Sequence, residues 1–336
     1  MVTVTKQRFQ SLIVAGSLIV SALIWGQQFA SVAAEQTGHS EIDALAWSPD
    51  GERIATGHQD GTVRIWNATT GQVLHTIQGY GCEVTSLAWK ADGSQLISGD
   101  FDINHDCEIT ARVWDTETGQ LLATLPGISG TSVLGASWSL DGTQVITFGF
   151  DVNPNLKLWD AVTFQLIAEE DKDGDAFQIA WRPDHTLVAL ADTVGKIILA
   201  DPVTFDPVMR LEESQASEGP IGGVYSVAWS PDGNLVAGGN TAGIVRLWDV
   251  ANGRNLMNLT GADSQVQGWT TTAIRAVHFS PDGSQIGSIA ADGTLRTWDV
   301  ETGAITSTEQ LAGPPLYAAA WSPDGTRIAY GGRTAL

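Results

Sequence analysis

One short pattern recurs seven times along the chain, and this repetition constrains the fold more than any other feature. In each copy a short apolar segment ends in an aromatic residue and runs into a tight turn, as in AWSPDG at 46–51. The aromatic residues follow one another at intervals of 42 to 50 residues: Trp47, Trp89, Trp138, Trp181, Trp229, Phe279 and Trp321. Repeats of that length are typical of propellers and solenoids.

The rest of each unit predicts three further strands. In the first unit a strand at 53–57 is followed by Asp60-Gly61, a dipeptide typical of hairpin turns, and then by strands at 62–67 and 71–77. A four-stranded sheet alone cannot bury both of its faces, whereas sheets stacked around an axis can. The sequence therefore predicts an all-β fold, a seven-bladed β-propeller of four-stranded antiparallel blades spanning residues 35–336.

The third strand of several units ends in Trp-Asp, as at Trp114-Asp115 and Trp248-Asp249. On these motifs the chain resembles the WD40-repeat β-propeller family. The resemblance implies a structural hydrogen-bond tetrad in the first blade, formed by His39, Thr56, Asp60 and Trp66. An alternative is the periplasmic propeller type with WSPDG-like repeats, as in TolB, but the recurring Trp-Asp favours WD40.

The seventh unit is predicted to be incomplete. Its first two strands, at 316–321 and 327–330, are recognisable, but the chain ends after the second strand. An unpaired strand edge invites aggregation. We therefore expect either that the sequence continues or that another chain completes this blade.

The N-terminal segment has the layout of a secretory signal. Lys6 and Arg8 precede an uncharged stretch whose apolar part runs over 11–25, and small residues follow at 31–34. We predict a signal peptide at residues 1–34, or a signal anchor if it is not cleaved. The protein is then expected to be exported, periplasmic or extracellular, and to contact a membrane only if the segment is retained.

Charge and motif content narrow the function. The net charge is -21, which disfavours nucleic acid as a partner. No nucleophile elbow, P-loop or zinc-protease motif is present, so we predict no enzyme activity and no cofactor. We expect a scaffold that binds a protein or peptide partner. The alternative is a propeller that binds or processes a small ligand at the mouth of its channel.

Partner-binding candidates lie on the face that carries the long loops, because variable loops on a rigid scaffold commonly bind. Trp269 is a tryptophan that the repeat does not explain, and Phe101 begins an expanded loop. A further set, four residues before each aromatic, is expected to ring the channel mouth: Asp43, Thr85, Tyr225, Arg275 and Tyr317. Leu134 and Phe177 occupy the same position, where core packing is the competing interpretation.

The long loops also suggest two stabilising features. Cys82 and Cys107 both fall on this face of the second unit, which predicts a disulfide. We predict no metal site, although two oxygen-rich loops are weak calcium candidates through Asp102, Asp106, Asp171, Asp173 and Asp175.

Overall fold

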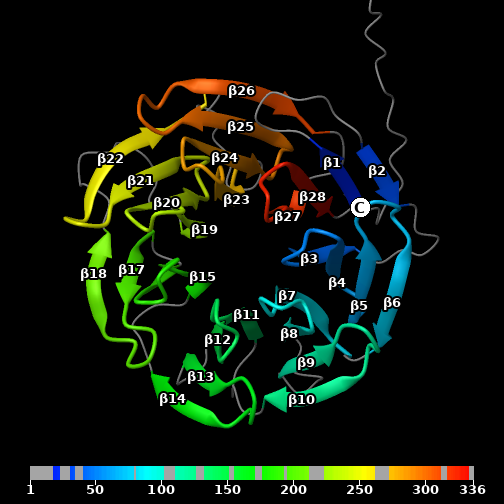
Figure 1. Ribbon diagram of the computed structural model, residues 1–336. Coiled ribbons are helices and arrows are strands. Elements are labelled where there is room, and N and C mark those ends of the chain that lie inside the picture. The colour runs from blue at the N-terminus through cyan, green and yellow to red at the C-terminus, as the bar shows by residue number, and fades with distance from the viewer. Residues whose placement is uncertain are drawn as a thin grey trace, which may run out of the picture.

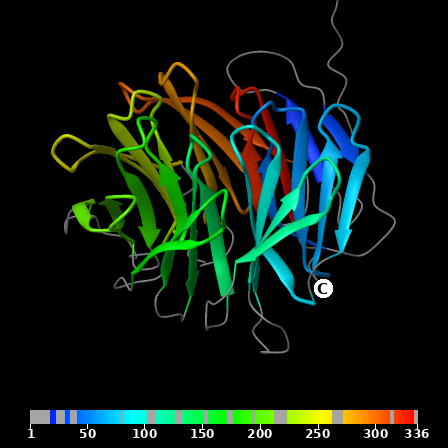
Figure 2. The same ribbon diagram turned by 60° about the horizontal axis from the view of Figure 1, so that its bottom comes forward.

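The computed structural model describes residues 18–22, 31–34, 41–78, 81–101, 110–125, 132–150, 155–170, 176–192, 195–211, 223–261, 272–311 and 316–332. All secondary-structure elements within these ranges are β-strands, and their sheets are arranged around a common centre (Figure 1). In Figure 2 the strands of each sheet run between the two faces of the resulting disc. The prediction of an all-β propeller is confirmed. None of the described segments forms a helix of the length and apolarity needed to cross a membrane.

In each unit, the strand nearest the centre of the ring is the one that ends in the repeated aromatic residue (Figure 1). These innermost strands are β3 (Ile42–Trp47), β7 (Glu83–Trp89), β11 (Ser132–Trp138), β15 (Ala176–Trp181), β19 (Val224–Trp229), β23 (Ile274–Phe279) and β27 (Leu316–Trp321). Each pairs with the strand that follows the tight turn, namely β4 (Arg53–His58), β8 (Gln95–Phe101), β12 (Gln144–Phe150), β16 (Val188–Asp192), β20 (Leu235–Asn240), β24 (Gln285–Ala290) and β28 (Arg327–Gly332).

The third and fourth strands of six units complete their sheets toward the rim. The third strands are β5 (Thr62–Asn67), β9 (Ala111–Asp115), β13 (Leu156–Asp160), β17 (Ile197–Ala200), β21 (Val245–Asp249) and β25 (Thr294–Asp299). The fourth strands are β6 (Val73–Gln78), β10 (Leu121–Leu125), β14 (Leu166–Glu170), β18 (Pro207–Leu211), β22 (Arg254–Leu259) and β26 (Ile305–Gln310).

The strands form six hydrogen-bonded sheets among the described residues, not seven separate ones. Five sheets have four strands, and the sixth has eight, because β7–β10 and β11–β14 are joined where Ser132 pairs with Phe101. The predicted count of seven blades is therefore not confirmed by the number of sheets.

The last sheet is not incomplete, and that prediction is wrong. Two strands from the N-terminal segment, β1 (Leu18–Ala22) and β2 (Ser31–Ala34), complete it in the order β2-β1-β28-β27. The backbone of β1 runs antiparallel to β28, with Ile19 opposite Tyr330. The edge of β28 thus gains hydrogen-bond partners from the same chain. Because an apolar run fits both a signal segment and a buried strand, the sequence pattern did not distinguish the two.

Hydrogen bonds between neighbouring units explain why a small residue precedes the aromatic in every unit except the sixth, where His278 stands. The indole Nε1 of Trp47 donates to the carbonyl oxygen of Ala320 (3.0 Å), and that of Trp89 donates to Ala46 (3.1 Å). Trp138 and Trp229 bind Ala88 and Ala180 in the same way. A small residue leaves room for the neighbour's indole to reach the backbone. The small residue before the aromatic is therefore explained by the packing between units.

Cationic side chains reinforce these contacts, a feature that the sequence analysis missed. The guanidinium of Arg53 lies 4.8 Å from the ring centre of Trp89 and also donates to the carbonyl of Gly93 (2.9 Å). Arg327 lies over Trp47 at 4.7 Å and donates to Gly51. Lys90 and Arg182 lie over the tryptophans of the next units in the same way.

Three of the four predicted tetrad residues, Thr56, Asp60 and Trp66, lie within the described part of the first unit. Trp66 Nε1 donates to Thr56 Oγ1 (2.8 Å), and Thr56 Oγ1 also lies 2.8 Å from His58 Nε2. Asp60 accepts bonds from the backbone N–H and the hydroxyl of Thr62. His39 lies outside the described residues, so the complete tetrad stays a prediction.

Candidate functional site

Each of the seven innermost strands carries a β-bulge at the same place, four residues before its aromatic. In β3, for example, Ile42 pairs with His58 and Ala44 with Gly57, so Asp43 has no partner opposite it. A bulge bends the strand and redirects the side chain of the extra residue. The seven bulged residues, here named the bulge ring, are Asp43, Thr85, Leu134, Phe177, Tyr225, Arg275 and Tyr317.

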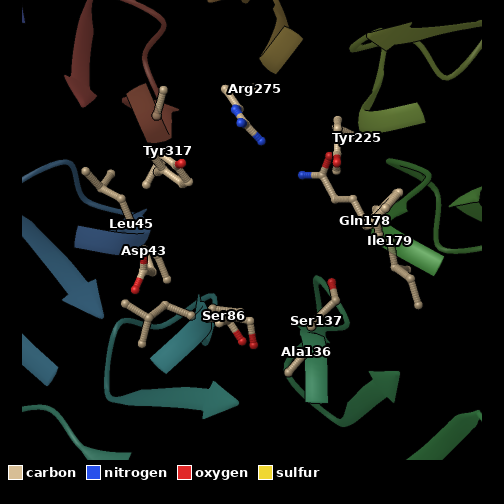
Figure 3. A pocket seen from close by; sticks show the side chains of 18 of the residues that line it. Asp43, Leu45, Ser86, Ala136, Ser137, Gln178, Ile179, Tyr225, Arg275 and Tyr317 are labelled. Atoms are coloured by element: carbon tan, nitrogen blue, oxygen red, sulfur yellow. The ribbon is translucent and has the colours of Figure 1, made fainter. Parts of the chain in front are cut away.

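The bulge ring surrounds a central cavity of about 500 Å³. Six of its members line this cavity, and the seventh, Leu134, has a side chain outside the described residues. Figure 3 shows several of the lining side chains, which reach the cavity from different sheets. The structure thus brings together the residues that the repeat spacing predicts at the channel mouth. The core-packing interpretation of Phe177 is not supported, because Phe177 is only half-buried and lines the cavity.

An arginine lies between two tyrosines on one side of the cavity. The guanidinium carbon of Arg275 is 5.3 Å from the ring centre of Tyr225 and 5.4 Å from that of Tyr317. The ring of Phe177 packs against Tyr225, with 4.4 Å between ring centres. Cation–π contacts of this kind favour one orientation of the arginine side chain. Four bulges in adjacent sheets therefore build one aromatic and cationic cluster.

Gln178 also belongs to the site, although the sequence analysis missed it. Its Oε1 accepts a hydrogen bond from the backbone N–H of Val227 (2.7 Å), and the side chain lines the cavity. The position three residues before the aromatic holds a small residue in every other unit: Ala44, Ser86, Gly135, Ser226, Ala276 and Ala318. That exception in an otherwise small-residue position was the available sequence signal.

Several cavity-lining polar groups lack a hydrogen-bond partner within the described part of the chain. They include Arg275 Nε, Thr85 Oγ1 and Ser86 Oγ. Ser86 is a buried residue, 9% exposed. A buried polar group without a partner costs free energy, and such groups are commonly satisfied by water or a ligand.

The remaining candidates are not brought to the cavity by the described residues. Phe101 is half-buried at the end of β8, where its backbone pairs with Glu83 and Ser132. Cys82 is buried (8% exposed), but Cys107 lies outside the described residues, so their disulfide stays a prediction. Trp269 and the five calcium candidates Asp102, Asp106, Asp171, Asp173 and Asp175 also lie outside them. The described ranges contain no group of three or more side chains suited to holding a metal ion.

Comparison with known families gives two matches. The family described as "WD domain, G-beta repeat" matches residues 71–115, 213–249 and 259–299. The family described as "Anaphase-promoting complex subunit 4 WD40 domain" matches residues 12–92. Neither match indicates a catalytic family.

Individual relatives match over short stretches. A periodic tryptophan protein 2 homolog of Dictyostelium discoideum is 38% identical over 74 residues, which is 22% of this chain and 8% of the relative. The Mus musculus homolog is 46% identical over 50 residues, covering 15% of this chain and 5% of the relative. Small ribosomal subunit protein RACK1y of Oryza sativa subsp. japonica is 35% identical over 66 residues, covering 19% and 20%. The chain therefore aligns with only a small part of each relative's length.

These comparisons contradict the predicted exported location, periplasmic or extracellular. The relatives are eukaryotic proteins, and one of them is named as a protein of the small ribosomal subunit. The match at 12–92 begins inside the segment that the pattern predicts as a signal. Pairing of β1 with β28 gives that apolar segment a place in the fold, which is the physical reason why its composition misled the prediction of export.

Proposed function

Because the chain belongs to the WD40-repeat β-propeller family, we propose that it is a scaffold that binds a protein partner through the face onto which the bulge ring opens. The observation that carries this proposal is the bulge ring itself. Seven equivalent strands carry a bulge at this position, and the six described bulge side chains line the cavity with acidic, hydroxyl, cationic and aromatic groups. A core layer is typically uniform and apolar, whereas a specific binding surface combines aromatic, charged and polar groups.

The position of the bulge ring along the strands selects the face. Each bulge lies near the start of an innermost strand, at the end opposite the tight turns such as Ser48–Gly51. The connections between successive units enter at that same end. Trp269 lies outside the described residues and Phe101 ends β8, and both stay candidates for partner contacts from their place in the sequence.

We further propose that the eight-stranded sheet counts as two blades, which gives the ring seven. Its halves, β7–β10 and β11–β14, repeat the strand order of the four-stranded sheets. Trp138 donates to the carbonyl of Ala88 across the boundary between the halves, as Trp89 donates to Ala46 across the preceding boundary. The Ser132–Phe101 pair is then an additional link between two neighbouring blades.

A peptide selection tests the proposal. A library of random peptides displayed on phage is selected against the full chain, and binding of the enriched peptides is compared among variants. We expect Tyr317→Ala and Arg275→Ala to reduce binding at least about tenfold, the size of one lost charged contact. The matched control is Val162→Ala, since Val162 is 79% exposed in the turn between β13 and β14 on the opposite face.

Two outcomes would overturn the proposal. One is enriched peptides that bind both mouth variants as tightly as the unaltered chain. The other is enriched peptides whose binding depends on Val162 and not on the bulge ring. Circular dichroism of each variant establishes that the fold is retained.

A further inference from the structure

The polar groups on one side of the cavity are mostly hydrogen-bond donors. Gln178 on β15, Tyr225 on β19 and Arg275 on β23 come from three neighbouring sheets, and we name these residues the donor cluster. In Figure 3 the guanidinium of Arg275 and the amide nitrogen of Gln178 both point toward the middle of the cavity. The carboxylate of Asp43 lies on the other side of it.

Arg275 is held in place without using its donors. The rings of Tyr225 and Tyr317 flank its guanidinium at 5.3 and 5.4 Å. Within the described part of the chain no hydrogen bond or ion pair involves this side chain, and its Nε is buried without a partner. A guanidinium carries five N–H donors in a planar fork and has no acceptor. An oriented arginine with unused donors is suited to bind an acceptor that comes from outside the chain.

The amide of Gln178 is oriented by a bond on its far side. Its Oε1 accepts from the backbone N–H of Val227 at 2.7 Å, which identifies the carbonyl end of the amide. The Nε2 group is therefore the end that faces the cavity, and it is a donor only. Ser226 forms the equivalent bond to Val277 N at the next boundary, but its short side chain leaves no donor in the cavity. Gln178 thus adds a directed N–H₂ group to the cavity that Arg275 also lines.

We propose that the donor cluster binds a carboxylate group of the partner, which deepens and rests on the proposed function. A carboxylate is planar, accepts two parallel bonds from a guanidinium, and leaves lone pairs for Gln178 Nε2 and the hydroxyl of Tyr225. One unit of negative charge is matched by the single arginine of the cavity lining. A phosphate dianion fits less well, because the chain carries a net charge of -21 and repels additional negative charge.

The test observes Arg275 directly. Nuclear magnetic resonance of the ¹⁵N-labelled full chain follows the Nε–H signal of Arg275, assigned by its loss in Arg275→Lys. The probes are acetyl-glutamate amide, acetyl-glycine with a free terminal carboxylate, acetyl-phosphoserine amide, and the neutral acetyl-glutamine amide. We expect a saturable shift with one or both carboxylate probes. Binding of the neutral probe is expected to be at least about tenfold weaker, since it lacks the charge-assisted bond.

Two glutamine variants test whether the side chain of Gln178 contributes to binding of the carboxylate. Gln178→Ala is expected to weaken binding of the carboxylate probe about tenfold. Gln120→Ala, a change at an exposed residue between β9 and β10, is expected to leave the affinity of the probe unchanged. The two carboxylate probes distinguish an acidic side chain from a chain terminus.

The inference is overturned if neither carboxylate shifts the signal, if the neutral probe shifts it equally, or if phosphoserine binds more tightly than both carboxylates. Such a result leaves the proposed function intact when selected peptides still depend on Tyr317 and Arg275. Conversely, carboxylate binding without any selected peptide supports the donor cluster and contradicts the scaffold.

Discussion

The indole Nε1 of Trp47 donates a 3.0 Å hydrogen bond to the carbonyl oxygen of Ala320, a residue that lies 273 positions further along the chain. This bond closes the ring, because Trp47 belongs to the first complete sheet and Ala320 to the last. It has the same form as the bonds between neighbours within the ring, such as Trp89 to Ala46. The closing boundary therefore uses the packing that the repeat encodes everywhere else.

The first prediction concerns this bond. Trp47→Phe keeps an aromatic ring but removes the indole donor, so we expect a loss of about 1 kcal/mol in the free energy of unfolding beyond the effect of the smaller ring. The control is Trp181→Phe, because the Nε1 of Trp181 has no hydrogen-bond partner within the described part of the chain. Urea denaturation of both variants measures the difference. Equal losses would show that the Ala320 bond contributes nothing.

A second prediction concerns pH. His278 occupies the position that is alanine in five other units, and its ring stacks on that of Trp321 at 5.8 Å. Burial lowers the pKa of His278 from 6.5 to about 4. The folded protein therefore binds fewer protons than the unfolded chain between these values. Stability is at its full value above pH 6.5 and falls by up to about 3 kcal/mol as the pH drops to 4.

His278→Ala is expected to remove this loss. The comparison is between slopes of unfolding free energy against pH, from 7 to 4.5, so that any change in packing cancels. Carboxylates contribute at lower pH, as for Asp282, whose pKa is lowered to about 2 by hydrogen bonds from Ser280 and Ser284. An unchanged slope in the variant would contradict the assignment to His278.

A third prediction concerns the N-terminal strands. Deleting residues 1–34 removes β1 and β2 and exposes the edge of β28, so we expect a loss of about 2 kcal/mol or more and a tendency to aggregate. Deleting only residues 1–17 keeps both strands and is the matched control. Thermal denaturation and light scattering measure the two effects. If both deletions behave alike, β1 and β2 do not stabilise the ring.

The fourth prediction is the Cys82–Cys107 disulfide. Alkylation of the unfolded protein without a reductant is expected to leave both cysteines unmodified, and prior reduction is expected to expose two thiols to the reagent. Closing a loop of this length stabilises a fold by about 3 kcal/mol in the chain-entropy view. Two modified cysteines before reduction would rule out the bridge, and mass spectrometry reads the result.

Much of the fold follows from the repeat. The spacing of Trp47, Trp89 and their counterparts predicts the innermost strands, and the turn signals after them predict the other strands of each unit. The strands at 18–22 and 31–34 were not predicted, because an apolar segment at an N-terminus satisfies two physical roles equally well. Only the partner strand, β28, distinguishes them.

The site was predicted in part. Counting four residues back from each aromatic found the positions of the bulge ring, since a repeat places equivalent residues at the same level along the axis of the propeller. The contacts within it could not be predicted, because the stacking of Arg275 between Tyr225 and Tyr317 depends on side chains from three sheets. Gln178 was missed because its role depends on a backbone N–H in the next sheet.

The central claim is that a partner binds the face onto which the bulge ring opens. Its most direct test is hydroxyl-radical footprinting of the chain with and without a selected peptide. Tyr317 at the channel mouth is 44% exposed, and Leu140 in a tight turn on the opposite face is 48% exposed, so both react without the peptide. The account predicts that the peptide protects Tyr317 and Tyr225 and leaves Leu140 and Val162 unchanged. Protection of Leu140 or Val162, with Tyr317 still fully reactive, would contradict it.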